Sequence, residues 1–112
     1  MISAFVWLAL APCTIMGTPG NDVIIGTRGN DVICALGGND LVDALWGNDV
    51  VWGGLGADRI EVGAGRDTVY GGPGNDTFYA WDGTLDKLVG GPGADVAYSD
   101  TFDRAWSIER FV

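Results

Sequence analysis

Short apolar triplets alternate with polar turns along most of the chain. From residue 17 to residue 98 the sequence divides into nine units of nine residues, and the eighth unit has one extra residue. Each unit has six residues rich in Gly, Asn and Asp and then three β-prone residues. The middle residue of each triplet is always apolar: Ile24, Ile33, Val42, Val51, Ile60, Val69, Phe78, Leu88 and Ala97. Because side chains alternate between the faces of a strand, these residues are predicted to point inward and their neighbours outward.

The nine-residue period predicts a solenoid. A strand of three residues does not fold alone, but stacked units bury a continuous core. Gly, Asn and Asp suit the turns, because they tolerate positive φ or bend the chain through side-chain hydrogen bonds. Two units complete one coil, so alternate units stack on the same side. We predict an all-β fold, a parallel β-roll (β-solenoid) of about nine units over residues 17–98. Residues 99–112 are expected to cap its end with Phe102, Trp106, Ile108 and Phe111.

An aspartate ends the turn of every unit: Asp22, Asp31, Asp40, Asp49, Asp58, Asp67, Asp76, Asp86 and Asp95. Stacked turns would bring like charges to roughly 5 Å, at a cost of about 1 kcal/mol per neighbouring pair even in water. We therefore interpret these carboxylates as metal ligands rather than as a solvated face. Oxygen ligands of this kind suit Ca²⁺ better than Mg²⁺, which requires octahedral geometry. The chain has no His and two Cys, so ordinary zinc, copper or haem sites are not expected.

The units match the nonapeptide GGxGxDxUx, and the chain thereby resembles the RTX (repeats-in-toxin) family of calcium-binding β-rolls. The resemblance implies a right-handed parallel β-roll in which aspartate carboxylates and backbone carbonyls hold Ca²⁺ between stacked turns. Units five, seven and nine keep the full Gly-Gly start, which makes Asp58, Asp76 and Asp95 the best-supported ligands. Alternate stacking predicts two rows, one with Asp22, Asp40, Asp58, Asp76 and Asp95 and the other with Asp31, Asp49, Asp67 and Asp86.

Several units depart from the family pattern. Units one and two carry Thr18 and Thr27 at the second position, Ala35-Leu36 and Ala44-Leu45 replace the leading glycines of units three and four, and Val62 opens unit six. We expect weaker calcium sites at these turns, because a side chain would crowd the carbonyls that face the ion. Asp86 is the least supported ligand, because the extra residue distorts its turn.

The apolar N-terminal segment, residues 1–16, has two interpretations. Its apolar run is shorter than the roughly 20 residues that cross a bilayer, so no membrane span is expected. The segment is either a secretory signal, although it begins without Lys or Arg, or a cap on the first coil. Counting back nine residues from Ile24 gives Ile15, so the roll is expected to start with a partial unit near Thr14.

The two cysteines also leave two alternatives. Cys13 and Cys34 either form a disulfide, which would contribute about 3 kcal/mol, or remain buried thiols. By the phase of the repeat Cys13 falls in a turn and Cys34 at a strand end. A disulfide therefore requires the N-terminal segment to leave the ideal path.

The charge and the residue types limit the function. Asp and Glu total 15 against 6 Lys and Arg, so the net charge of −9 disfavours nucleic acid and anionic membranes as partners. Without His, and with aspartates spaced by a repeat, no catalytic set is expected, and the chain is interpreted as a non-enzyme. The first hypothesis is a secreted, extracellular calcium-binding protein whose folding is coupled to Ca²⁺ binding.

Two alternatives remain open. One is an adhesion or interaction module that contacts an unidentified protein or glycan through an outward column of Cys34, Trp52, Tyr70 and Val89. Cross-strand packing explains the same column and is favoured. The other alternative is an accessory module of a larger RTX enzyme. The last four residues, 109–112, also resemble the C-terminal signals of RTX exporters, although Arg110 interrupts the pattern.

Overall fold

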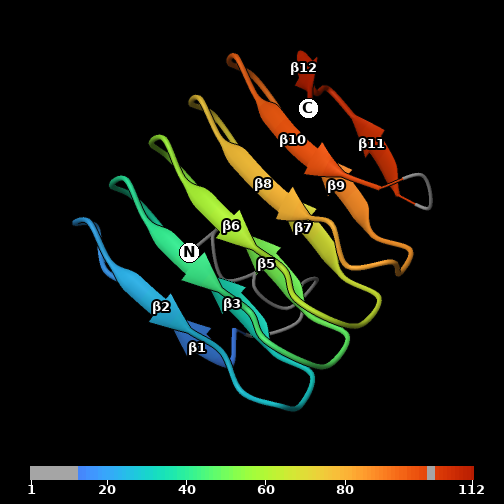
Figure 1. Cartoon of the computed structure of the whole chain (residues 1–112). Helices are drawn as coiled ribbons and strands as arrows, with labels where there is room; N and C mark the ends of the chain where they lie inside the picture. Colours follow the sequence, from blue (N-terminus) through green and yellow to red (C-terminus); the bar gives the residue numbers. More distant parts are fainter. Residues whose placement is uncertain (1–12, 101–102) are drawn as a thin grey trace, which may run out of the picture.

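Two parallel β-sheets face each other across a thin core (Figure 1). The computed structural model describes residues 13–100 and 103–112, and the described part of the chain contains β-strands and turns but no helix. One sheet has the order β1-β3-β5-β7-β9-β11, with strands Ile15–Met16, Val32–Cys34, Val50–Trp52, Thr68–Tyr70, Lys87–Val89 and Arg104–Trp106. The other has the order β12-β10-β8-β6-β4-β2, with strands Arg110–Phe111, Val96–Ser99, Thr77–Ala80, Arg59–Glu61, Leu41–Asp43 and Val23–Ile25. The predicted parallel β-roll is confirmed.

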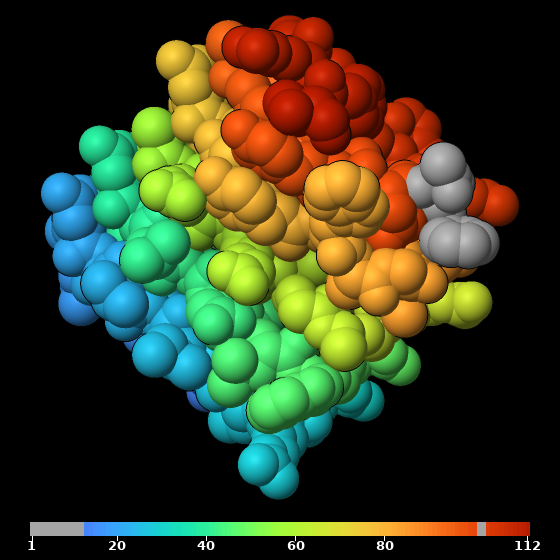
Figure 2. Space-filling view, in the orientation of Figure 1, coloured from blue at the N-terminus to red at the C-terminus, as the bar shows by residue number. Residues whose placement is uncertain are grey.

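Alternate units stack in register, as expected. Ile33 lies opposite Val51, and Val51 lies opposite Val69, at a spacing of two units. Across the extra residue the spacing lengthens by one, since Val69 pairs with Leu88. The extra residue is thus absorbed in a turn, and the coils continue in sequence order from the N-terminal to the C-terminal end (Figure 2).

The middle residue of every triplet lies in the core. Eight of the nine are fully buried and Ile24, in the first complete unit, is 7% exposed. Further apolar residues join this core from the first position of their units: Ala35, Ala44, Val62 and Ala80. At the first position of these units the side chains of Ala35, Ala44 and Val62 therefore border the core. The weaker calcium sites expected in these units stay a prediction.

The turns place glycine in a left-handed conformation where layers touch. Gly74 has φ +120°, and a Cβ there would overlap the carbonyl oxygen of Gly56 in the preceding layer. Leu36 and Leu45 also adopt positive φ, 72° and 66°, at the position where units five, six, seven and nine have their second glycine. Units three and four thus keep the turn geometry at the cost of some backbone strain.

Partial units extend the roll at both ends, so nine units is an approximate count. The chain enters the roll at β1, where Ile15 pairs with Ile33, which confirms the partial unit expected near Thr14. Cys13 and Cys34 form a disulfide with a Cα–Cα distance of 5.8 Å, which decides between the two alternatives. The signal or cap predicted for residues 1–16 lies mostly outside the described residues. Within those residues no helix is long and apolar enough to cross a bilayer.

The C-terminal segment continues both sheets. Strand β11 pairs with β9 and strand β12 with β10. Ala105 and Ile108 pack against the core. Trp106 pairs with the outward Val89 and is 49% exposed, so it does not cover the last coil as expected. Phe111 is 57% exposed and pairs with the buried Ala97. Phe102, the fourth residue expected in the cap, lies outside the described residues.

Candidate metal centre

The nine predicted ligands lie in two rows, each formed where a turn meets the strand that follows it. The rows are Asp22, Asp40, Asp58, Asp76 and Asp95, and Asp31, Asp49, Asp67 and Asp86, as the stacking predicted. All are buried except Asp22, which is half-buried. Each row runs along the roll, with one aspartate per layer.

Hydrogen bonds link each aspartate to the next layer. The amide of Asp40 donates to Oδ1 of Asp58 at 2.8 Å, and the amide of Asp49 donates to Oδ1 of Asp67 at 2.7 Å. The same bond recurs between the other neighbouring layers of both rows. From the second layer of each row onward, the backbone therefore fixes one oxygen of every carboxylate and orients the other.

That other oxygen has no hydrogen-bond partner in seven of the nine aspartates. Within the described residues, buried and unpaired Oδ2 atoms occur in Asp40, Asp49, Asp58, Asp67, Asp76, Asp86 and Asp95. A buried carboxylate oxygen without a partner costs roughly 1–3 kcal/mol or more. Because unpaired oxygens recur in layer after layer of both rows, we infer that a positively charged partner belongs beside them.

The first aspartate of each row is satisfied differently. The backbone amide and the hydroxyl of Thr18 donate to the two oxygens of Asp22, at 2.7 and 2.8 Å. Thr27 makes the same contacts with Asp31. Threonine, at the second position of the unit, thus competes with a cation for these two carboxylates. The sequence analysis ranked Asp58, Asp76 and Asp95 above the other aspartates, and the structure adds that threonine hydroxyls already donate to Asp22 and Asp31.

Backbone carbonyl oxygens lie beside the unpaired carboxylates. A Cβ on Gly53 would lie 2.8 Å from Oδ2 of Asp58 and 2.7 Å from the carbonyl oxygen of Gly71, so both oxygens border one small space. In the next layer Gly71 is placed in the same way between Asp76 and the carbonyl of Gly90. Carboxylate and carbonyl oxygens are the ligands that Ca²⁺ takes in proteins. The donor set therefore fits a hard divalent cation.

Burial makes these carboxylates weak acids. The pKa of Asp58 and of Asp67 is raised from 3.8 to about 7, and the pKa of Asp76 and of Asp86 to about 8. Desolvation is the largest cause, the backbone hydrogen bond from the preceding layer opposes it, and repulsion between carboxylates adds to it. Without a cation Asp58, Asp67, Asp76 and Asp86 therefore retain protons near neutral pH, and a divalent ion would displace them.

Two acidic residues beyond the repeat continue the rows. The amide of Asp86 donates to Oδ1 of Asp103 at 3.0 Å, and the amide of Asp95 donates to Oε1 of Glu109 at 2.8 Å. The sequence reasoning missed both roles, because these residues follow their predecessors by 17 and 14 positions and have left the period. The only feature of the sequence that could have indicated these roles is that both residues are acidic and follow the last units.

Asparagines at the fifth position of the units form a further ladder on each side of the roll. The amide of Asn39 donates to Oδ1 of Asn21 at 2.7 Å, and the amide of Ala57 donates to Oδ1 of Asn39 at 2.8 Å. The side chains of Asn30, Asn48 and Asn75 accept in the same way. Asparagine had been assigned only to turn formation, but here it also ties consecutive turns together.

The turn that contains the extra residue brings an additional acid to the second row. Asp67, Asp82 and Asp86 can each offer one oxygen such that the three oxygens lie within 4.8 Å of one another. Asp82 was not among the predicted ligands. The sequence signal was present, since Asp82 occupies a turn position that carries no acid in any other unit.

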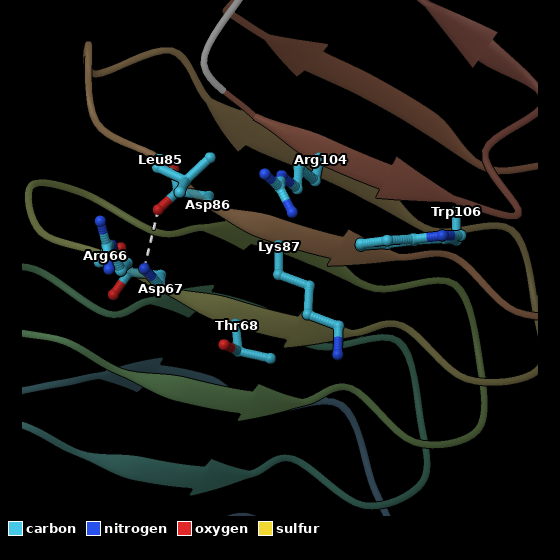
Figure 3. Close-up of a pocket in the computed structure, with 8 residues that line it drawn as sticks. All are labelled: Arg66, Asp67, Thr68, Leu85, Asp86, Lys87, Arg104 and Trp106. Carbon is cyan, nitrogen blue, oxygen red and sulfur yellow. Dashed lines mark hydrogen bonds between the residues drawn. The ribbon is translucent and has the colours of Figure 1, made fainter.

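A pocket of about 300 Å³ lies next to this turn, on the outer face of the first sheet (Figure 3). Lys87, Arg104 and Trp106 project from strands β9 and β11 along one wall, and Arg66 and Leu85 reach in from the turns. The hydrogen bond between Asp67 and Asp86 closes the turn side. Basic side chains thus gather beside one acidic row in a chain of strongly negative charge.

The outward aromatic column is packed on itself. Trp52 and Tyr70 stack with ring centroids 4.2 Å apart, and the ammonium group of Lys87 lies 5.8 Å from the centre of the Tyr70 ring. On the other sheet Tyr79 and Tyr98 stack at 4.8 Å. These contacts agree with cross-strand packing, the favoured interpretation of the column.

Comparison with known proteins agrees with the repeat. The family model of the RTX calcium-binding nonapeptide repeat matches residues 16–51 and 52–84, with four copies. No curated protein and no solved structure matches the chain.

Proposed function

Because the chain belongs to the family of RTX calcium-binding nonapeptide repeats, we propose that it is a calcium-binding β-roll whose two aspartate rows hold Ca²⁺ between stacked layers. The observation that supports the proposal most is the line of buried Oδ2 atoms without partners. Such atoms in consecutive layers are explained together by ions between the layers, whereas a structural role for each aspartate would leave them unexplained.

The proposal assigns different weights to the nine aspartates. Asp40, Asp58, Asp76 and Asp95 in one row, and Asp49, Asp67 and Asp86 in the other, would be the ligands. Asp22 and Asp31 would contribute less, because threonine already pairs their oxygens. Ca²⁺ would neutralise the carboxylates and join adjacent turns through carboxylate and carbonyl oxygens. The role is structural, and no catalytic step is assigned to the chain.

Calcium binding would be coupled to folding. The metal-free roll must bury two rows of carboxylates, each near the next, and its thin core contains one middle residue per unit. If a site has a Kd of about 10⁻⁴ M, then about 1 mM calcium adds roughly 1.4 kcal/mol of stability per site. Several such sites are comparable with the net stability of a small domain. RTX repeat proteins are typically secreted, and we propose an extracellular location, where calcium is abundant enough to drive this folding.

Circular dichroism with and without a chelator tests the proposal. We expect calcium to raise the β-sheet signal and the melting temperature, and magnesium at the same concentration to do little. Asp58→Asn should weaken the response more than Asp22→Asn, because only Asp58 has an unpaired Oδ2. A spectrum and melting curve that do not change with calcium would refute the proposal.

The adhesion alternative and the enzyme-accessory alternative gain no specific support. The rings of Trp52 and Tyr70 are occupied with each other, which favours a packing role. Replacing both with alanine separates the two functions: the calcium-binding proposal expects calcium-induced folding to persist in this variant.

A further inference from the structure

The turn of the eighth unit differs chemically from every other turn. Its third residue is Asp82, whereas the third position of the other units holds Pro, Arg, Gly, Trp, Leu or Ala. The unit also contains the extra residue, which lengthens the spacing from Asp67 to Asp86 to 19 residues. The turn of this unit therefore has both one more residue and one more carboxylate than a regular turn.

The structure holds Asp82 in a defined orientation. The amide of Thr84 donates to Oδ1 of Asp82 at 2.8 Å, and the hydroxyl of Thr84 contacts the same Oδ1 and the carbonyl oxygen of Gly65, the latter at 2.6 Å. These bonds occupy one oxygen of Asp82 and tie its turn to the layer before it. The second oxygen of Asp82 is buried and has no hydrogen-bond partner among the residues that the structure describes.

The same is true of the two row aspartates that Asp82 joins. Asp67 and Asp86 are each 1% exposed, and Oδ2 of both is buried without a hydrogen-bond partner. Each of the three carboxylates can place one oxygen within 4.8 Å of the others. Asp67 and Asp86 are thus buried carboxylates that each keep an unpaired oxygen, and they lie beside a third carboxylate that also keeps one.

Asp103, from the following layer, is a fourth acidic residue next to these three carboxylates. Its Oδ1 accepts from the amide of Asp86 and its Oδ2 accepts from the amide of Asp100, at 3.0 and 3.1 Å. Asp103 therefore fixes the backbone of Asp86 from the following layer and adds negative charge nearby. A regular layer offers a cation two aspartates of one row, whereas this layer offers three carboxylates.

We propose that Asp67, Asp82 and Asp86 form a distinct calcium site that binds Ca²⁺ more tightly than the regular sites of the two rows. The proposal rests on the function proposed above and adds a ligand that the nonapeptide pattern does not contain. Calcium affinity in proteins rises with the number of charged ligands and with the rigidity of the site, and the third carboxylate and its threonine anchor supply both.

Calorimetric titration of the whole chain with CaCl₂, starting from the metal-free protein, tests the proposal. We expect one tight site followed by a weaker phase for the regular sites. Asp82→Asn should weaken the tight site about tenfold or more and leave the weaker phase unchanged, because one charged ligand is lost. Asparagine keeps the Oδ1 acceptor for Thr84, so the turn is preserved.

Two control variants make the result specific. Glu61→Gln removes one negative charge from an exposed strand position on the other sheet and should change neither phase. Asp76→Asn removes a ligand of the other row and should weaken only the second phase. A circular dichroism spectrum in saturating calcium shows that each variant folds.

The outcomes separate this inference from the proposed function. Unchanged tight binding in Asp82→Asn, or an equal loss in Glu61→Gln, overturns the three-carboxylate site while calcium binding by the rows stands. A parent chain that binds no calcium in either phase overturns the proposed function and this inference with it.

Discussion

Replacement of Asp76 by asparagine should change stability in opposite directions with and without calcium. Asp76 is fully buried, its Oδ1 accepts from the amide of Asp58 at 2.9 Å, and its Oδ2 has no hydrogen-bond partner. Asparagine has nearly the same shape and retains the Oδ1 acceptor, but it carries no charge. The variant therefore isolates the contribution of the charge.

Without calcium the charge is a cost. The pKa of Asp76 is raised from 3.8 to about 8, chiefly by desolvation and then by repulsion from Asp58 and Asp95. At pH 7 the folded chain must keep this group protonated while the unfolded chain ionises it, which costs up to about 4 kcal/mol at roughly 1.4 kcal/mol per pKa unit. The buried amide of asparagine costs about 1–3 kcal/mol of its own. We expect the metal-free variant to be more stable than the parent by about 1–3 kcal/mol.

With calcium the charge is a ligand. Asp76 lies between Asp58 and Asp95 and so borders the spaces between three consecutive layers. Loss of two sites of about 10⁻⁴ M affinity in about 1 mM calcium removes roughly 3 kcal/mol of linked stability. The calcium-bound variant should therefore be less stable than the calcium-bound parent, and the sign of the effect reverses.

Urea unfolding followed by circular dichroism measures the calcium-bound pair, with Glu61→Gln as the control for loss of one exposed charge. For metal-free chains that are too unstable to fold in buffer, the trimethylamine N-oxide concentration that induces folding gives the comparison, because this osmolyte favours burial. The variant should fold at a lower osmolyte concentration than the parent. An equal or higher requirement without calcium, or unchanged stability with calcium, would refute the reasoning.

Three further predictions follow from the same structure. The folded metal-free chain binds more protons than the unfolded chain between about pH 4 and pH 8, because burial raises the pKa values of Asp49, Asp58, Asp67, Asp76 and Asp86 to about 6 to 8. Its stability should therefore fall as the pH rises through this window. In saturating calcium the trend should reverse, because protons compete with the ion, and pH-dependent melting curves measure both trends. Gly74→Ala should cost more stability than Gly83→Ala. Both glycines have positive φ, but a Cβ on Gly74 would overlap the carbonyl oxygen of Gly56, whereas a Cβ on Gly83 would enter open space. Melting curves of the two calcium-bound variants measure the difference, and equal losses would contradict the contact between layers. Replacing Cys13 and Cys34 by serine should cost about 3 kcal/mol, because their disulfide closes a loop over a sequence separation of 21, and a loss below about 1 kcal/mol in urea unfolding would show that the bridge constrains little.

Much of the fold was predictable because a short period has few structural solutions. A middle apolar residue in each triplet has to face a core, and all nine such residues do, from Ile24 to Ala97. The positions of the two aspartate rows follow from the same period, since alternate turns must stack. The start of the roll at Ile15 was also accessible by counting nine residues back.

The end of the roll was not accessible in this way. Asp103 and Glu109 continue the rows at spacings outside the period, so their roles depend on how the last segment folds back over the preceding coil. Likewise, Trp106 is a large apolar residue that composition assigns to a cap, but register places it on the outer face of β11.

The sequence by itself determined the repeating coil, its core residues and the two rows of acids, because each depends on the side-chain period and on the preferences of turn residues. The tertiary structure decided which carboxylate oxygens are paired. Asp22 and Asp58 occupy the same position in their units, but unit one has Thr18 where unit five has Gly54. The structure shows that the Thr18 hydroxyl reaches Asp22, whereas Oδ2 of Asp58 has no partner among the described residues. It also decided that Asp82 joins Asp67 and Asp86, because the contact connects different layers and depends on the path of a lengthened turn.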